Sequence, residues 1–72
     1  MTSTTGRWWT VGVLGMYSVK FDYAQNIEDA HNNQQLYIQY MQQNGYHDID
    51  LLICWEVGYK LNQQVGRYPL GE

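Results

Sequence analysis

Cysteine, proline and positive charge are all scarce in this chain. Its 72 residues include one cysteine, one proline and four lysines and arginines, against seven acidic residues. A single cysteine excludes an internal disulfide and is typical of a reducing compartment, so the fold depends on packing alone. With a net charge of −3 and only four lysines and arginines, which are scattered along the sequence, the chain lacks the basic patch that binds the phosphates of nucleic acid. We therefore expect no direct nucleic-acid binding.

Long apolar runs are missing as well. No stretch approaches the length that crosses a bilayer, and the polar start MTSTTG lacks the apolar core of a secretion signal. These absences predict a soluble cytoplasmic protein with no membrane partner. The length suits one domain over residues 1–72, with residues 1–5 as a disordered lead-in.

Aromatic residues are abundant, with three tryptophans, seven tyrosines and one phenylalanine, and large rings suit a small core. RWWTVGVL, residues 7–14, and YSVKFDY, residues 17–23, predict two strands of a hairpin. Strict alternation in the second strand would place its four large apolar side chains on one face: Tyr17, Val19, Phe21 and Tyr23.

Residues 26–45 have the pattern of a helix. Asn26 is a capping residue with an acid three positions later, and Gly45 in an Asn-Gly pair supplies a stop. The residues spaced to share one helical face, which we expect against the sheet, are Ile27, Ala30, Gln34, Tyr37, Ile38 and Met41.

The last third of the chain predicts two more strands. IDLLICWEV, residues 49–57, is apolar on both alternating faces and suits a central strand, whereas the polar YKLNQQV, residues 59–65, suits an edge. The tail GRYPLGE is expected as a closing turn or loose end. The order of elements predicts an α+β fold, β-β-α-β-β, with one mainly antiparallel sheet and a single helix packed on one face.

The adjacent tryptophans must point to opposite faces of their strand. We expect Trp9 beneath the helix and Trp8 on the uncovered face, near Leu52 and Cys54. An exposed indole would mark a contact surface, and symmetric self-association would bury it. A homodimer or a higher even oligomer is therefore predicted, with Trp8 or the Leu36–Tyr40 patch of the helix at the contact. In the alternative reading, the tail shields Trp8.

No residue pattern indicates catalysis. His31 and His47 belong to no cluster with metal-ligand spacing, and Asp48 and Asp50 lack neighbours that would separate their pKa values. Cys54, within an apolar strand, is typical of a small buried hydrophobe. We therefore expect no enzymatic activity, no metal and no cofactor.

Two further groups have the chemistry to bind a partner. Leu36 and Tyr40, at i and i+4, form an apolar pair on the helix side roughly opposite the sheet-facing residues Ile27 and Met41, which either anchors a partner or packs under the tail. Arg7 or Arg67 would hold the phosphate of a nucleotide-like ligand stacked on aromatic rings, in a pocket between subunits.

The strand-to-helix junction VKFDYAQNIEDA, residues 19–30, resembles a pattern in small phage-encoded inhibitors of bacterial defence, including several anti-CRISPR proteins of α+β fold. The resemblance covers residues 17–30. It implies a small, acidic, non-enzymatic and often dimeric protein, and it carries over no site residue.

The first functional hypothesis is a non-catalytic binding protein, a phage or mobile-element inhibitor that occludes a host defence protein. The alternatives are an oligomer that sequesters a nucleotide-like molecule between aromatic side chains, and an accessory subunit of a host complex. The candidate contact residues are Trp8, Leu36, Tyr40, Arg7 and Arg67.

Overall fold

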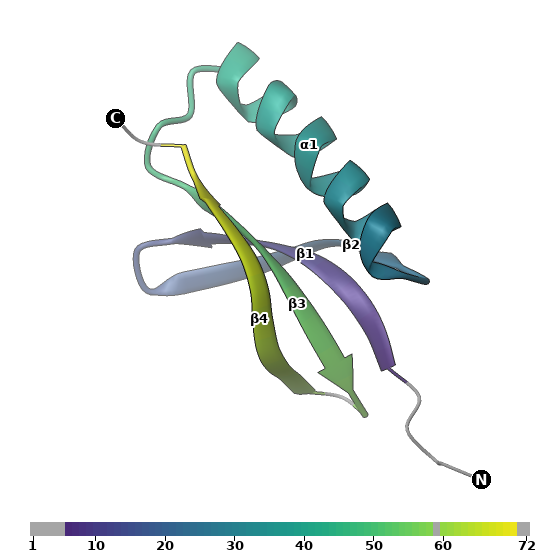
Figure 1. Cartoon of the computed structure of the whole chain (residues 1–72). Coiled ribbons are helices and arrows are strands. Elements are labelled where there is room, and N and C mark those ends of the chain that lie inside the picture. Colours follow the sequence, from purple (N-terminus) through teal and green to yellow (C-terminus); the bar gives the residue numbers. More distant parts are fainter. Residues whose placement is uncertain (1–5, 59, 71–72) are drawn as a thin grey trace, which may run out of the picture.

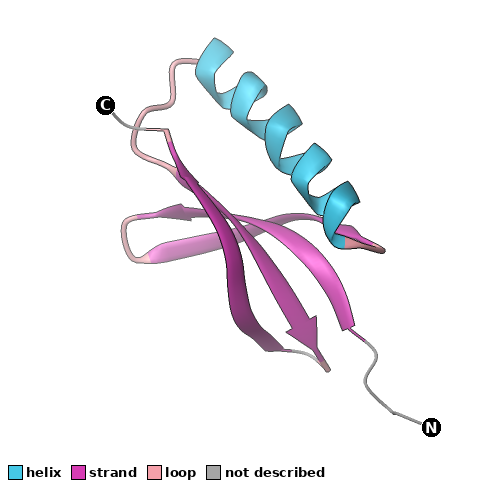
Figure 2. Cartoon of the chain, in the orientation of Figure 1, coloured by secondary structure: helices cyan, strands magenta, loops and turns pink. Residues whose placement is uncertain are grey.

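The described residues of the computed structural model, 6–58 and 60–70, form four strands and one helix. The elements are β1 (Gly6–Leu14), β2 (Tyr17–Ala24), α1 (Ile27–Gln43), β3 (Asp50–Val57) and β4 (Lys60–Pro69). The strands make one antiparallel sheet in the order β2-β1-β3-β4, and α1 lies across one face (Figure 1, Figure 2). The predicted α+β fold is confirmed. The disorder predicted for residues 1–5 concerns a segment outside the described residues.

Local signals in the sequence set both ends of α1. The Asn26 side chain accepts a 2.8 Å hydrogen bond from the backbone N–H of Asp29, one of the groups that a helix start leaves without a partner. Beyond the other end, Gly45 has a φ of 81°, a left-handed conformation that favours glycine and ends the helix. The predicted cap and stop are confirmed.

The main core lies between α1 and the central strands. Leu51 and Ile53 of β3 have no exposed surface and pack against the helix. The buried helix residues are Ala30, Gln34, Ile38 and Met41. Gln34 is accommodated because its Nε2 donates a 3.0 Å hydrogen bond to the Leu51 carbonyl. The sheet-facing side of the helix is the predicted one.

The two tryptophans occupy the opposite faces from those expected. Trp8 lies on the helix-covered face, against the cluster that contains Ala30, with its ring centre 4.6 Å from that of Trp55. Trp9 lies on the other face, against the cluster that contains Leu52. The prediction of Trp8 on an uncovered face is therefore wrong.

Residue size explains this reversal. The β1 residues that share a face with Trp8 are Thr10 and Gly12, and both are buried. The helix comes close enough for the Thr10 hydroxyl to donate to the Ala30 carbonyl at 3.3 Å, and Gly12 leaves room for the Phe21 ring. A helix backbone can approach the strand face with small side chains more closely than the face with valines.

On the face of the sheet away from the helix, the apolar side chains pack against one another and are covered by their neighbours. Its buried residues are Val11, Leu52 and Cys54, with Trp9, Val13 and Leu61 packed against them. The Trp9 indole N–H donates to Glu56, and the Lys20 ammonium lies 5.0 Å from the Trp9 ring centre. Because Leu52 and Cys54 are only 6% and 5% exposed, the expected open apolar face is also wrong.

An extra residue interrupts β2. The register with β1 shifts after Thr10, which leaves Phe21 without a partner. Such an insertion breaks the alternation of side chains. Phe21 therefore packs towards the helix, with its ring centre 4.6 Å from that of Tyr37, whereas Tyr23 lies 5.8 Å from Trp9 on the opposite face. The prediction that the four apolar side chains of β2 share one face is wrong.

The C-terminal tail is more ordered than expected. Its residues 66–69 continue β4, which pairs with β3 up to the partners Asp50 and Pro69. Leu70 is 6% exposed, and its N–H donates to the Ile49 carbonyl at 3.1 Å. The tail therefore closes the core beside the C-terminal end of α1 (Figure 1).

Candidate functional site

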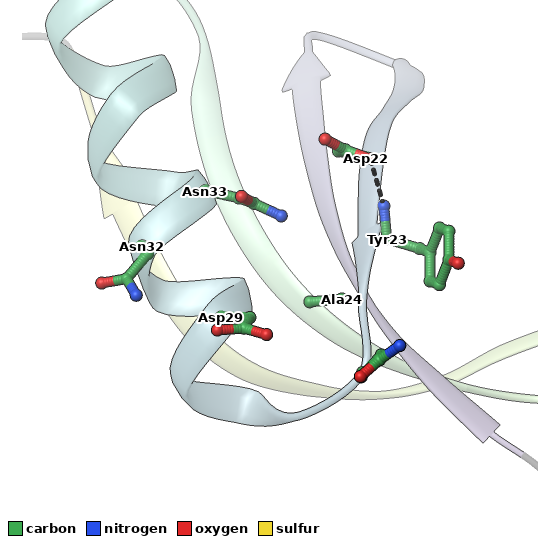
Figure 3. Close-up of a pocket in the computed structure, with 7 residues that line it drawn as sticks. Asp22, Tyr23, Ala24, Asp29, Asn32 and Asn33 are labelled. Carbon is green, nitrogen blue, oxygen red and sulfur yellow. Dashed lines mark hydrogen bonds between the residues drawn. The ribbon is translucent and has the colours of Figure 1, made fainter.

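A groove of about 310 Å³ lies between the first turns of α1 and the end of β2 (Figure 3). Its lining residues are Asp22, Tyr23, Ala24, Gln25, Asp29, Asn32 and Asn33. Asp29 and Asn33 extend from the helix towards β2, and the Tyr23 ring points away from the helix (Figure 3). Carboxylates and side-chain amides thus dominate this end of the site.

Two further grooves continue along the helix. The second, of about 320 Å³, is lined by Asp22, Asn33, Leu36, Tyr37 and Tyr40. The third, of about 400 Å³, is lined by Leu14, Tyr40, Met41, Gly45, Tyr46, His47, Asp48 and Ile49. The first and second share Asp22 and Asn33, and the second and third share Tyr40. The three are therefore parts of one surface, polar at the helix start and apolar towards its end.

Large apolar side chains surround the apolar part of this surface. Five of them from three separate segments make up what we call the helix–hairpin surface: Leu14, Tyr17, Leu36, Tyr40 and Tyr46. Their exposed fractions are 54%, 77%, 64%, 58% and 54%. At about 200 Å² for a large side chain, they expose roughly 600 Å² together. Apolar patches of this size on a single chain commonly serve in binding.

The structure brings two of the predicted contact residues into this surface and leaves three outside. Leu36 and Tyr40 line the second groove together. Trp8 lies on the helix-covered face, half-buried against the core. Arg7 lies over the Tyr23 ring, 5.0 Å from its centre, and Arg67 is ion-paired with Asp50. Neither arginine lines any of the three grooves.

Sequence reasoning missed the other three members of the helix–hairpin surface. Leu14 and Tyr17 are register partners at the end of the hairpin, and Leu14 lines the third groove together with Tyr40 of the helix. Tyr46 is placed by the loop after α1, where its N–H donates to the Met41 carbonyl at 3.0 Å. A tyrosine directly after the helix stop Gly45 was the available signal, but its proximity to Leu14 depends on tertiary packing.

One tyrosine in the second groove is electrostatically coupled to the strand beside it. Burial raises the pKa of Tyr37 above its ordinary value, and the negative charge of Asp22 raises it further. Asp22 and Tyr37 line the same groove between β2 and α1. Asp22 also accepts a 2.9 Å hydrogen bond from the Tyr23 backbone N–H.

Two of the residues considered for catalysis are buried or ion-paired in the fold. Cys54 is buried, and burial raises the pKa of its thiol, which lowers the thiolate fraction needed for nucleophilic attack. Asp50 is ion-paired with Arg67. Within residues 6–58 and 60–70, no group of three His, Cys, Asp or Glu side chains is placed to hold a metal ion. No helix in those ranges is long and apolar enough to cross a membrane.

Comparisons of the chain with protein-family models, with curated proteins and with solved structures gave no match.

Proposed function

We propose that this protein is a non-catalytic binding protein that occludes a partner protein through the helix–hairpin surface. The observation that carries the proposal is the gathering of exposed side chains from three segments, Leu14 from the hairpin, Tyr40 from the helix and Tyr46 from the loop, around one groove. Burying roughly 600 Å² of apolar surface approaches what each partner contributes to a standard protein interface, about 800 Å².

Both edge strands of the sheet are protected against pairing with a strand of another protein. A partner would therefore bind the helix–hairpin surface rather than extend the sheet. In β2, the extra residue Phe21 interrupts the ladder, and the Asp22 carboxylate accepts the hydrogen bond of the Tyr23 N–H. In β4, the register with β3 shifts twice, and the strand begins with Lys60 and ends with Pro69. Irregular edges with lysine and proline resist edge-to-edge association.

We propose a bacterial defence protein as the occluded partner, because residues 17–30 resemble a pattern in phage inhibitors of bacterial defence. Occlusion needs only a complementary surface, which agrees with a site of apolar side chains and amides. A plaque assay on a host carrying a CRISPR system tests this part: expression of the chain should restore phage growth, and expression of the Leu36→Asp variant should not.

The alternative of a sequestered nucleotide-like ligand gains no support from the arginines. Arg7 and Arg67 would have to hold the phosphate, but neither lines any of the three grooves: Arg7 lies over the Tyr23 ring, and Arg67 is ion-paired with Asp50. The accessory-subunit alternative involves the same kind of protein contact and is distinguished by the identity of the partner.

The test compares two substitutions of equal charge on the same helix. Leu36→Asp introduces a charge into the second groove, whereas Gln35→Asp introduces it at an exposed position that lines none of the three grooves. Tagged wild type should retain a specific protein from the cells that make it, identified by mass spectrometry. Leu36→Asp should lose that protein and Gln35→Asp should keep it, with similar thermal melts. Equal retention by both variants would contradict the proposal.

A further inference from the structure

Charge is divided unequally between the two faces of the molecule. On the face away from the helix, acidic groups have cationic partners: Lys20 lies 3.9 Å from Glu56, and Arg67 is paired with Asp50. Arg7 on the same face lies over Tyr23. Three of the four lysines and arginines of the chain thus lie on that face.

The grooves show the opposite balance. Each contains at least one carboxylate: Asp22 and Asp29 in the first, Asp22 in the second and Asp48 in the third. No lysine or arginine lines any of the three. The side chains of Asp22 and Asp29 are exposed, and their hydrogen bonds come from the neighbouring Tyr23 N–H and the Asn26 amide rather than from a lysine or arginine.

An apolar surface with a one-sided negative rim selects its partner by charge. We propose that the bound part of the partner is a positively charged amphipathic segment, with apolar side chains on Leu36 and Tyr40 and a lysine or arginine at Asp22 and Asp29. This inference rests on the proposed function and specifies the partner of the same surface.

A second copy of the chain is a poorer occupant. Two-fold contact through the helix–hairpin surface would bring the Asp22 and Asp48 of one copy near those of the other, and like charges at an interface oppose association. Of the two homodimer contacts predicted from the sequence, Trp8 packs against the core on the helix-covered face, and the Leu36–Tyr40 pair lies in the groove that Asp22 also lines. A nucleic acid would likewise be repelled by the carboxylates.

The experiment uses two synthetic amphipathic peptides of equal length, one of leucine and lysine and the other of leucine and glutamate. Titration calorimetry should show binding of the lysine peptide only, with affinity that falls as salt rises. In Asp22→Asn/Asp29→Asn the affinity should fall about tenfold, since two rim charge pairs are lost. Glu28→Gln, which removes a charge from an exposed residue outside the grooves, is the control and should bind within about twofold.

Leu36→Asp separates specific from purely electrostatic binding. It adds negative charge but removes an apolar anchor, so it should weaken the lysine peptide, and stronger binding would overturn the inference. Equal binding of the two peptides, unchanged affinity in the asparagine variant, or a concentration-dependent dimer that Leu36→Asp dissociates would also overturn it. If the cellular partner depends on Leu36 but not on Asp22 and Asp29, the proposed function stands and the charge inference falls.

Discussion

Substituting Gly12 by alanine tests the packing that positions the second groove. A Cβ at this buried position would overlap Cε2 of Phe21 and would lie 2.9 Å from Cζ of the same ring and 3.0 Å from Cδ1 of Ile49. The Phe21 ring is held in turn against Tyr37, with 4.6 Å between ring centres. The added methyl group must therefore displace a ring that supports a tyrosine of the groove.

The expected magnitude combines two opposing effects. Gly12 does not have a positive φ, so alanine fits the strand backbone and would by itself stabilise the fold by about 0.5–1 kcal/mol. Forcing an extra carbon into a packed core costs about 1–3 kcal/mol. We expect Gly12→Ala to lower the free energy of unfolding by about 1–2 kcal/mol, measured by urea denaturation.

A double-mutant cycle identifies the cause. Phe21→Leu alone removes packing and should destabilise, but in the Gly12→Ala background the smaller side chain gives the methyl group room. The two substitutions should therefore be coupled by at least about 0.5 kcal/mol in the favourable direction. A Gly12→Ala variant as stable as wild type, or strictly additive effects, would refute the close approach of Gly12 and Phe21.

Three further predictions concern the core and the helix. Asn26→Ala removes the acceptor of the Asp29 N–H and should lower the free energy of unfolding by about 0.5–2 kcal/mol in a thermal or urea melt; an unchanged melt would place the helix start elsewhere. Ile53→Ala empties a site with no exposed surface and should cost about 2–5 kcal/mol, enough to unfold much of the protein, and wild-type expression and melting would contradict the assigned core. The raised pKa of Cys54 means that less thiolate is present at any given pH, so alkylation by iodoacetamide at pH 8 should be far slower than for a free thiol and should become fast in urea. Because the folded pKa lies above the unfolded one, Cys54 favours folding below the ordinary thiol pKa, and this contribution is lost as the pH rises through the folded value; rapid alkylation of the native protein would show an open thiol instead.

Local signals predicted the elements, and tertiary contacts decided the faces. The helix could be placed from Asn26 and Gly45 because capping and left-handed conformations depend on neighbouring residues alone. The faces of Trp8 and Trp9 could not, because alternation shows only that they differ. The small side chains of Thr10 and Gly12 mark the face that the helix approaches. This could not be recognised from the sequence, because it depends on the contacts of Thr10 with Ala30 and of Gly12 with Phe21.

The candidate site was predictable for its helical half only. Leu36 and Tyr40 are four residues apart and must share a side of any helix. Leu14 and Tyr17 became part of the site because the end of the hairpin lies beside the C-terminal part of the helix and the loop after it, an arrangement that depends on tertiary packing. The unpaired residue Phe21 was unpredictable for a related reason, since a strand that alternates cleanly gives no sign of an insertion in its pairing.

Amide hydrogen exchange of the protein alone and bound to its captured partner tests the central claim most directly. The account predicts slower exchange on binding in residues 14–24 and 36–48, which carry the helix–hairpin surface and its grooves, with little change in residues 61–69 of β4. Protection confined to β4, or to β1 and β3 with the hairpin end and helix unchanged, would show that the partner binds the opposite side of the sheet and would contradict the account.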